Sequence, residues 1–173
     1  MSLLSRLLHR GHDRRHLLPL YAGIVAAARD PAWFRAGVPD TVDGRFDMIA
    51  ALLALVLIRM EDEGGTARAE TVALTELFID DMDGSLRQFG IGDLVVGKHV
   101  GKMMGALGGR LAAFRAAAGD EAAMADAVKR NLFHEAPPSD EAVIFVARRM
   151  AAFADGLNAA PAAALLAGEV PAL

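Results

Sequence analysis

Three aspartates in the first third of the chain have a spacing that could support acid–base or metal chemistry. Asp40, Asp43 and Asp47 fall within one narrow sector of a helix, with Arg45 nearly opposite. Acid–base catalysis needs burial to separate the pKa values of paired carboxylates, whereas these three are expected at an exposed helix start. Asp40 and Thr41 also suit helix capping, and acids there complement the helix dipole. Capping therefore explains the trio best, and a charged docking patch is the functional alternative.

A second acidic group lies in the segment 79–84, IDDMDG. Asp80, Asp81 and Asp83 do not match the calcium-loop pattern, which needs acids at alternate positions and a later glutamate. We interpret them as a solvated acidic face or a partner contact, and we expect Asp83 to pair with Arg87 at i,i+4. The alternative hypothesis is a small helical enzyme or ligand carrier that uses either acidic group with a divalent metal.

Other catalytic side chains are sparse. The absence of cysteine excludes disulfides, zinc thiolate sites and thiol nucleophiles. No serine stands in the strand–turn–helix setting of a nucleophile. We interpret His9, His12 and His16 as part of a solvated basic end, and His99 and His134 lie alone on separate predicted helices. We therefore predict no catalytic residue, no metal site and no cofactor, and expect that the protein is not an enzyme.

The hydrophobic pattern predicts the fold. The chain has 173 residues, enough for one domain with a sizeable core, and 54% of them are hydrophobic. Every residue from Met48 to Ile58 is apolar. This run is too short for a bilayer, which needs about 20 residues, so it predicts a buried central helix over about 41–62. No strand pattern or repeat stands out. The predicted fold is an all-α, single-domain bundle of six to eight helices around this central helix.

Charge is distributed unevenly. The net charge is −4, yet residues 1–16 carry four arginines against one aspartate. An acidic body argues against nucleic-acid binding. We divide the chain into a basic amphipathic leader (1–16), a helical domain (17–157) and an alanine-rich C-terminal tail (158–173) that we expect to form a short, frayed helix. The leader either contacts anionic lipid or docks on the domain as a short helix. Its candidate membrane-surface residues are Leu3, Leu4, Arg6, Leu7, Leu8, Arg10, Arg14 and Arg15.

The segment 94–118 is predicted to be a helix although it has glycine at every fourth position from Gly97 to Gly109. Each glycine costs about 1 kcal/mol relative to alanine. Small residues at this spacing let another helix approach closely. The glycines therefore either pack on the central helix or receive an apolar helix of a partner. Self-association through them is a weaker third option. The candidate partner-binding residues here are Lys98, Gly101, Lys102, Met103 and Met104.

The run 38–48, VPDTVDGRFDM, resembles the signature of the ubiquinol–cytochrome c chaperone family, and segments within 20–24, 81–93 and 98–110 extend the similarity. The resemblance implies a non-enzymatic assembly factor that binds newly made cytochrome b, or another subunit of the respiratory bc1 complex, with a small co-chaperone. Because no long targeting region precedes the signature, we expect a bacterial form, peripheral at the cytoplasmic face of the inner membrane. The remaining candidate partner-binding residues are Asp40, Asp43, Arg45, Asp47, Asp80, Asp83 and Arg87.

Overall fold

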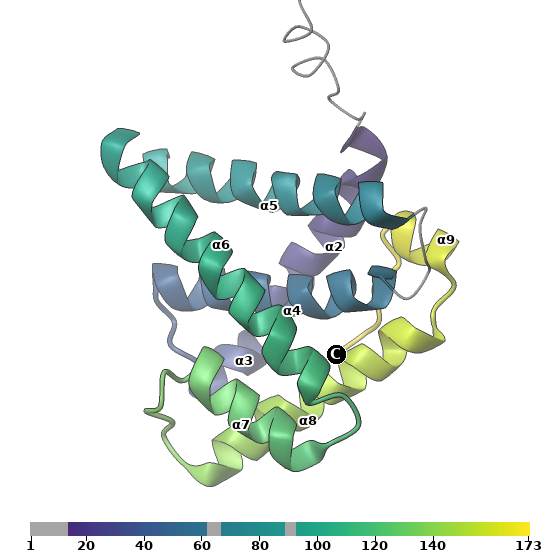
Figure 1. Cartoon of the computed structure of the whole chain (residues 1–173). Coiled ribbons are helices and arrows are strands. Elements are labelled where there is room, and N and C mark those ends of the chain that lie inside the picture. Colours follow the sequence, from purple (N-terminus) through teal and green to yellow (C-terminus); the bar gives the residue numbers. More distant parts are fainter. Residues whose placement is uncertain (1–13, 62–66, 89–92) are drawn as a thin grey trace, which may run out of the picture.

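The computed structural model describes residues 14–61, 67–88 and 93–173. Over these residues the chain forms eight α-helices and one short 3-10 helix, with no strand, which confirms the predicted all-α class (Figure 1). The elements are η1 (Arg14–Leu17), α2 (Leu18–Ala28), α3 (Pro31–Arg35), α4 (Val42–Glu61), α5 (Ala67–Gln88), α6 (Asp93–Ala116), α7 (Glu121–Asn131), α8 (Asp140–Ala159) and α9 (Ala162–Leu166).

Helix α4 lies at the centre of the bundle. It contacts α2, α5, α6 and α8. In the view of Figure 1, α5 lies above α4, α7 and α8 lie below it, and α6 crosses it diagonally. Every residue from Met48 to Leu57 is at most 5% exposed, so no side of this stretch faces water. This confirms the prediction of a buried central helix. Within the described ranges, no helix combines the length and apolar character that crossing a membrane requires.

The start of α4 depends on close backbone packing. The Thr41 hydroxyl accepts a hydrogen bond from the Gly44 backbone N–H at 3.0 Å, which satisfies one of the free donors of the first turn. Gly44 itself is buried, and a Cβ at this position would overlap the carbonyl oxygen of Pro39. The glycine in the 38–48 run therefore has a structural reason, because only glycine lets the preceding loop fold back this closely.

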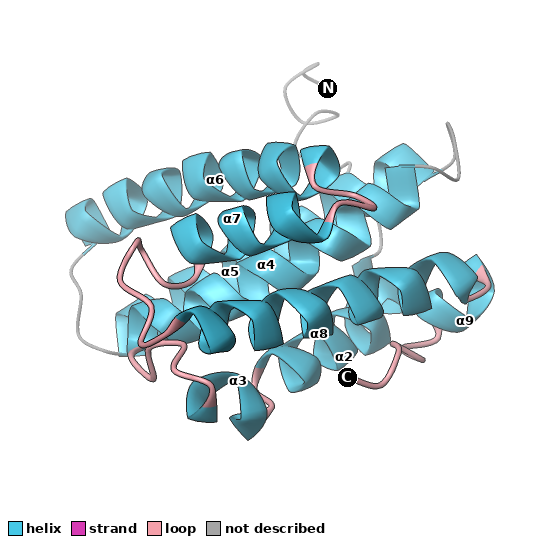
Figure 2. Ribbon diagram, turned by 90° about the horizontal axis from the view of Figure 1, so that it is seen from below, coloured by secondary structure: helices cyan, strands magenta, loops and turns pink. Residues whose placement is uncertain are grey.

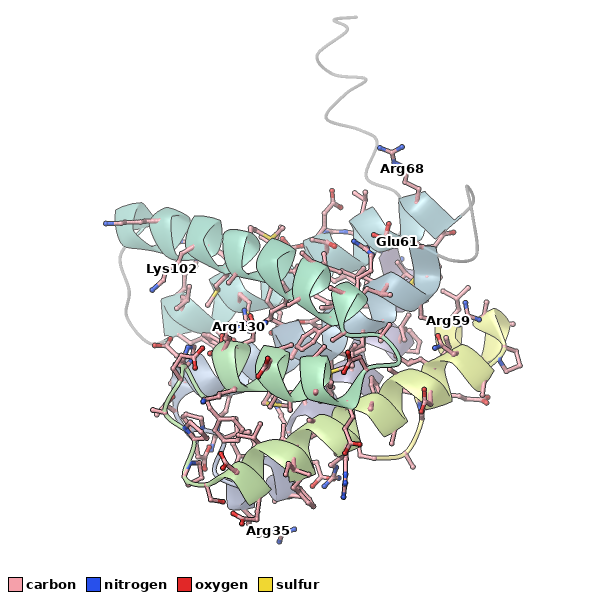
Figure 3. The ribbon with its side chains drawn as sticks, turned by 60° about the horizontal axis from the view of Figure 1, so that its bottom comes forward. Arg35, Arg59, Glu61, Arg68, Lys102 and Arg130 are labelled. Carbon is pink, nitrogen blue, oxygen red and sulfur yellow. The ribbon has the colours of Figure 1, made fainter. Side chains whose placement is uncertain are left out.

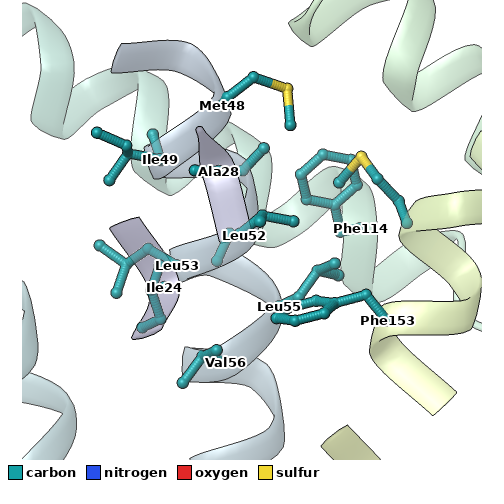
Figure 4. Close-up of a cluster of buried hydrophobic side chains, with 14 of the residues drawn as sticks. Ile24, Ala28, Met48, Ile49, Leu52, Leu53, Leu55, Val56, Phe114 and Phe153 are labelled. Carbon is teal, nitrogen blue, oxygen red and sulfur yellow. The ribbon is translucent and has the colours of Figure 1, made fainter. Parts of the chain in front are cut away.

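Aromatic side chains fill the space around α4. Phe114 from α6 and Phe153 from α8 converge on the central helix (Figure 4). Trp33 of α3 is fully buried, its indole N–H donates to the Ala27 carbonyl at 2.9 Å, and the Arg149 guanidinium lies 4.7 Å from its ring centroid. The tryptophan is part of the core, which ties the short helix α3 to α8.

The C-terminal tail forms the short helix α9 and packs on the bundle. Leu165 in α9 is only 3% exposed. A Cβ at Gly23 in α2 would meet the Val170 side chain at 3.1 Å. The view from below shows α8, α3 and α2 on the near side of the molecule, with the C-terminus beside them (Figure 2).

Candidate functional site

The glycines of α6 face away from the bundle. We call Gly97, Gly101, Gly105, Gly108 and Gly109 the glycine face. A Cβ built at any of them would meet no atom of the described residues within 4 Å. The interpretation that these glycines pack on the central helix is therefore wrong. Packing against the described residues does not offset their cost of about 1 kcal/mol each, so the glycine face needs another explanation.

Helix α6 packs on the bundle through its other side. Leu107 and Phe114 are 2% and 1% exposed, and α6 contacts α4, α5 and α7. Met103 and Met104 are half-buried against the same core. Lys102 is exposed and projects from α6 (Figure 3). The helix thus holds its apolar side in the core and presents glycine and lysine outward.

A pocket of about 230 Å³ lies beside α6, and we call it the Asp47 pocket. It is formed by side chains of α4, α5 and α6 and of the turn after α7. Its walls are mainly apolar and aromatic, while its polar groups include both acids and bases. The lining residues are Asp43, Phe46, Asp47, Ala50, Phe78, Lys102, Met103, Ala106, Arg110 and His134.

A buried arginine organises the polar part of this pocket. Arg110 is 4% exposed, and its Nη2 donates to an Asp47 carboxylate oxygen and to the Asn131 carbonyl, the latter at 3.0 Å. The other Asp47 oxygen lies 2.8 Å from His134 Nε2. Asp47 therefore compensates a buried cation whose desolvation would otherwise be costly.

One donor in this network remains unsatisfied. The Arg110 Nε is buried and has no hydrogen-bond partner among the described residues. A buried donor without a partner costs roughly 1 to 3 kcal/mol. Arg110 lines the Asp47 pocket, but its Nε is closed to solvent, so this cost is part of the fold itself.

Two sequence interpretations of this region need correction. Asp47 was expected at an exposed helix start, but its side chain is only 18% exposed because α6 and the turn after α7 cover it. His134 was expected alone on a helix, but it follows α7 in a turn with φ 49°, and Glu135 has φ 63°. The Glu135 N–H bonds the Lys129 carbonyl at 3.1 Å, which closes the end of α7 and presents His134 to Asp47.

Arg45 also differs from the helical-wheel expectation. Asp40 lies before the first residue of α4, so helical periodicity does not place its side chain opposite Arg45. Its carboxylate instead accepts a hydrogen bond from Arg45 Nε at 2.6 Å. This hydrogen bond lowers the Asp40 pKa and raises the Arg45 pKa. Both side chains are exposed, so the pair contributes little to stability.

The acids of α5 bind groups of their own chain. Asp83 pairs with Arg87 at 2.7 Å, which confirms the predicted i,i+4 pair. Asp80 lies 2.8 Å from Arg14, and Asp81 accepts from the Tyr21 hydroxyl at 2.8 Å. Burial raises the Tyr21 pKa, and the bond to Asp81 adds to this effect. Within the described part of the chain, no group of three metal-ligating side chains is placed to hold an ion.

The predicted residues thus separate into distinct places. Asp43, Asp47, Lys102 and Met103 meet in the Asp47 pocket. Lys98, Gly101 and Met104 lie along the same helix α6. Asp40 with Arg45, and the α5 acids with their cations, form separate local groups. Arg15 is exposed in η1. The other leader residues fall outside the described ranges, namely Leu3, Leu4, Arg6, Leu7, Leu8 and Arg10.

Sequence reasoning missed Arg110, which is the central residue of the pocket. A signal was present, since Arg110 lies three residues after Leu107 and four before Phe114. These positions share one side of a helix, so Arg110 interrupts an apolar stripe. A charge in such a stripe needs a partner, although the identity of that partner is not visible in the sequence.

Comparison with known proteins identifies the family. The family described as ubiquinol-cytochrome C chaperone matches residues 34–172, and the chain therefore belongs to this family. A solved structure, described as the Cbp3 homolog from Brucella abortus, is 31% identical with a TM-score of 0.79. The alignment covers 99% of this chain and 97% of that chain. No curated protein matches. The family identity inferred from the 38–48 run is confirmed, and the match extends well beyond that run.

Proposed function

We propose that this protein is a non-enzymatic assembly chaperone of the bc1 complex. Its client is newly made cytochrome b, or another bc1 subunit, and the client binds along the glycine face of α6 and at the Asp47 pocket. The observation that carries this proposal is the exposure of a glycine-rich helix face against which none of the described residues packs. Family membership supports the assembly role.

The chemistry of α6 suits an apolar helical client. Glycines let the backbone of a second helix approach closely, so van der Waals contact extends along both helices. Met103 and Met104 are flexible and polarizable, and can fit varied apolar side chains. The client offers transmembrane segments that must be kept from aggregating before they are assembled.

The Asp47 pocket adds a polar contact next to the glycine face. Lys102 and Met103 belong both to α6 and to the pocket lining. A client side chain that carries a carboxylate could enter between the aromatic walls and pair with the exposed Lys102. The pocket would thus fix the register of a client helix that the glycine face alone would leave free to slide.

Affinity purification from cells that make the bc1 complex tests this proposal. A tagged wild-type chain should recover cytochrome b or another bc1 subunit, together with any small co-chaperone. Gly101→Leu should reduce this recovery because the side chain obstructs the approach of a client helix. Ala152→Leu is the matched control, since Ala152 is an exposed small residue on α8. Equal recovery of bc1 subunits with both variants would show that the glycine face does not bind the client.

We also propose that the protein acts peripherally at the cytoplasmic face of the inner membrane, through the basic leader and anionic lipid. The arginines and leucines of residues 1–16 support this, because charge attraction and apolar insertion act together at a lipid surface. Removal of residues 1–13 should weaken binding to anionic vesicles, and salt should weaken the wild-type binding. Unchanged vesicle binding after this truncation would show that another part of the protein contacts the membrane.

A further inference from the structure

A second hollow lies on the other side of the α4 start and has a basic lining. Its volume is about 480 Å³, and we call it the arginine hollow. Three arginines from three parts of the fold line it, since Arg29 follows α2, Arg35 ends α3 and Arg45 lies in the first turns of α4. The remaining lining residues are Pro31, Phe34 and Asp40.

The charges of the arginine hollow are only partly balanced among the described residues. The neighbouring Asp30 has a lowered pKa, mainly because of the hydrogen bond from the Ala32 backbone N–H, and the charges of Arg149 and Arg35 add to this effect. Asp40 is its single carboxylate, and it is bound by Arg45. Among the described residues, no carboxylate lies within ion-pair distance of Arg29 or Arg35. The nearby Asp30 is bound by Arg149 at 2.6 Å. The lining thus carries three positive charges against one negative charge, in a protein whose net charge is −4.

Arg45 is the arginine of the hollow whose orientation is restrained by its neighbours. The Arg45 guanidinium lies 5.9 Å from the Phe34 ring centroid, so contacts with Asp40 and Phe34 restrict its orientation. Arg35 projects outward from the molecule at α3 (Figure 3). Guanidinium groups bind phosphate oxygens through paired N–H donors, and several arginines around one space offer donors from several directions.

The helix dipoles of α2 and α3 give a competing explanation for the positions of Arg29 and Arg35. Arg29 and Arg35 stand at the C-terminal ends of α2 and α3, where a cation is favoured. This explains each arginine separately, but it does not explain why both share one hollow with Arg45. The hollow also lies beside the start of the 20-residue helix α4, since Asp40 and Arg45 line it, and the dipole of this helix favours an anion there.

We propose that the arginine hollow binds a phosphate group, with Arg29 and Arg35 as the free donors and Arg45 as the oriented third. The ligand is either the phosphate of an anionic phospholipid headgroup or a soluble phosphate compound. This site is separate from the Asp47 pocket and does not depend on the client-binding role of α6.

The test is titration of the full-length protein with inorganic phosphate, followed by NMR of backbone amides. The double variant Arg29→Gln/Arg35→Gln is compared with Arg68→Gln/Arg130→Gln, which removes two exposed arginines from other faces (Figure 3). In the wild type, saturable shifts are expected around residues 34–37. The Arg29→Gln/Arg35→Gln variant, which we call the hollow variant, should bind phosphate roughly tenfold more weakly than the wild type. The Arg68→Gln/Arg130→Gln control variant should bind phosphate like the wild type. Absence of saturable shifts, or equal weakening in both variants, would overturn the proposal.

A second arm distinguishes the two sources of the phosphate. Co-sedimentation with phosphatidylglycerol vesicles compares the same three proteins, with phosphatidylcholine vesicles as the reference. A loss of anionic-vesicle binding in the hollow variant alone assigns the site to a lipid headgroup. Equal vesicle binding by all three proteins, together with site-specific phosphate binding, assigns it to a soluble phosphate. Thermal melts of both variants identify any loss of folding. Neither arm involves client capture, so failure here leaves the chaperone proposal standing.

Discussion

Replacement of Asp47 by asparagine should destabilise the fold far more than its position near a helix start suggests. The carboxylate neutralises Arg110, which is 4% exposed and cannot turn its guanidinium into water without leaving the core. Breaking a buried ion pair by removing one charge costs about 3 to 5 kcal/mol. Asp47 keeps 18% of its side chain exposed, and asparagine retains one acceptor, so we expect the lower end, about 3 kcal/mol.

The assay is thermal and urea unfolding of Asp47→Asn beside Asp43→Asn. For a chain of this size, about 3 kcal/mol corresponds to a fall in Tm of roughly 9 °C. Asp43 is exposed one turn earlier in the same helix, and its neutralisation should change stability by less than about 0.5 kcal/mol.

A third variant separates charge from packing. Joint replacement by Asp47→Leu and Arg110→Met removes both charges and should recover most of the lost stability, because an apolar pair of similar volume often substitutes for a buried ion pair. Equal effects of Asp47→Asn and Asp43→Asn would refute the reasoning. A double variant no more stable than Asp47→Asn would also contradict it.

Three further predictions concern the start of α4 and the glycine face. Gly44→Ala should destabilise the protein by roughly 2 kcal/mol through overlap with the preceding loop, whereas Gly101→Ala should stabilise it by up to about 1 kcal/mol, both measured by urea unfolding. NMR titration should place the Asp40 pKa below its ordinary value, and Arg45→Gln should restore that value. Because the folded pKa is the lower one, any stabilisation by this pair is present above the unfolded pKa and is lost as pH falls through the folded pKa.

Much of the fold could be predicted from local sequence signals. The run 48–58 is apolar at every position, and this alone predicts a buried helix. Helix ends are predicted by local breaks at Pro31, Gly64 and the pair Pro137 and Pro138. These signals need no knowledge of distant contacts. The family signature at 38–48 is likewise contiguous, so it could be recognised from the sequence alone.

The candidate site could be predicted only in part, because its contacts join distant segments. Asp47 is 63 residues from Arg110 and 87 from His134, and no local pattern specifies such pairs. Apolar character also does not decide burial by itself. Val72 and Ile144 are apolar, yet they are 54% and 42% exposed. Periodicity identifies a face of a helix but not the partner that packs on it.

Site-specific photo-crosslinking during bc1 assembly tests the central claim most directly. A photoreactive residue at position 101 on the glycine face is compared with one at position 152 on α8, where the outer surface is also open. The proposed function predicts a crosslink between position 101 and cytochrome b, or another newly made bc1 subunit, and none from position 152. Equal crosslinking from both positions, or none from position 101, would contradict the claim that the glycine face of α6 receives the client.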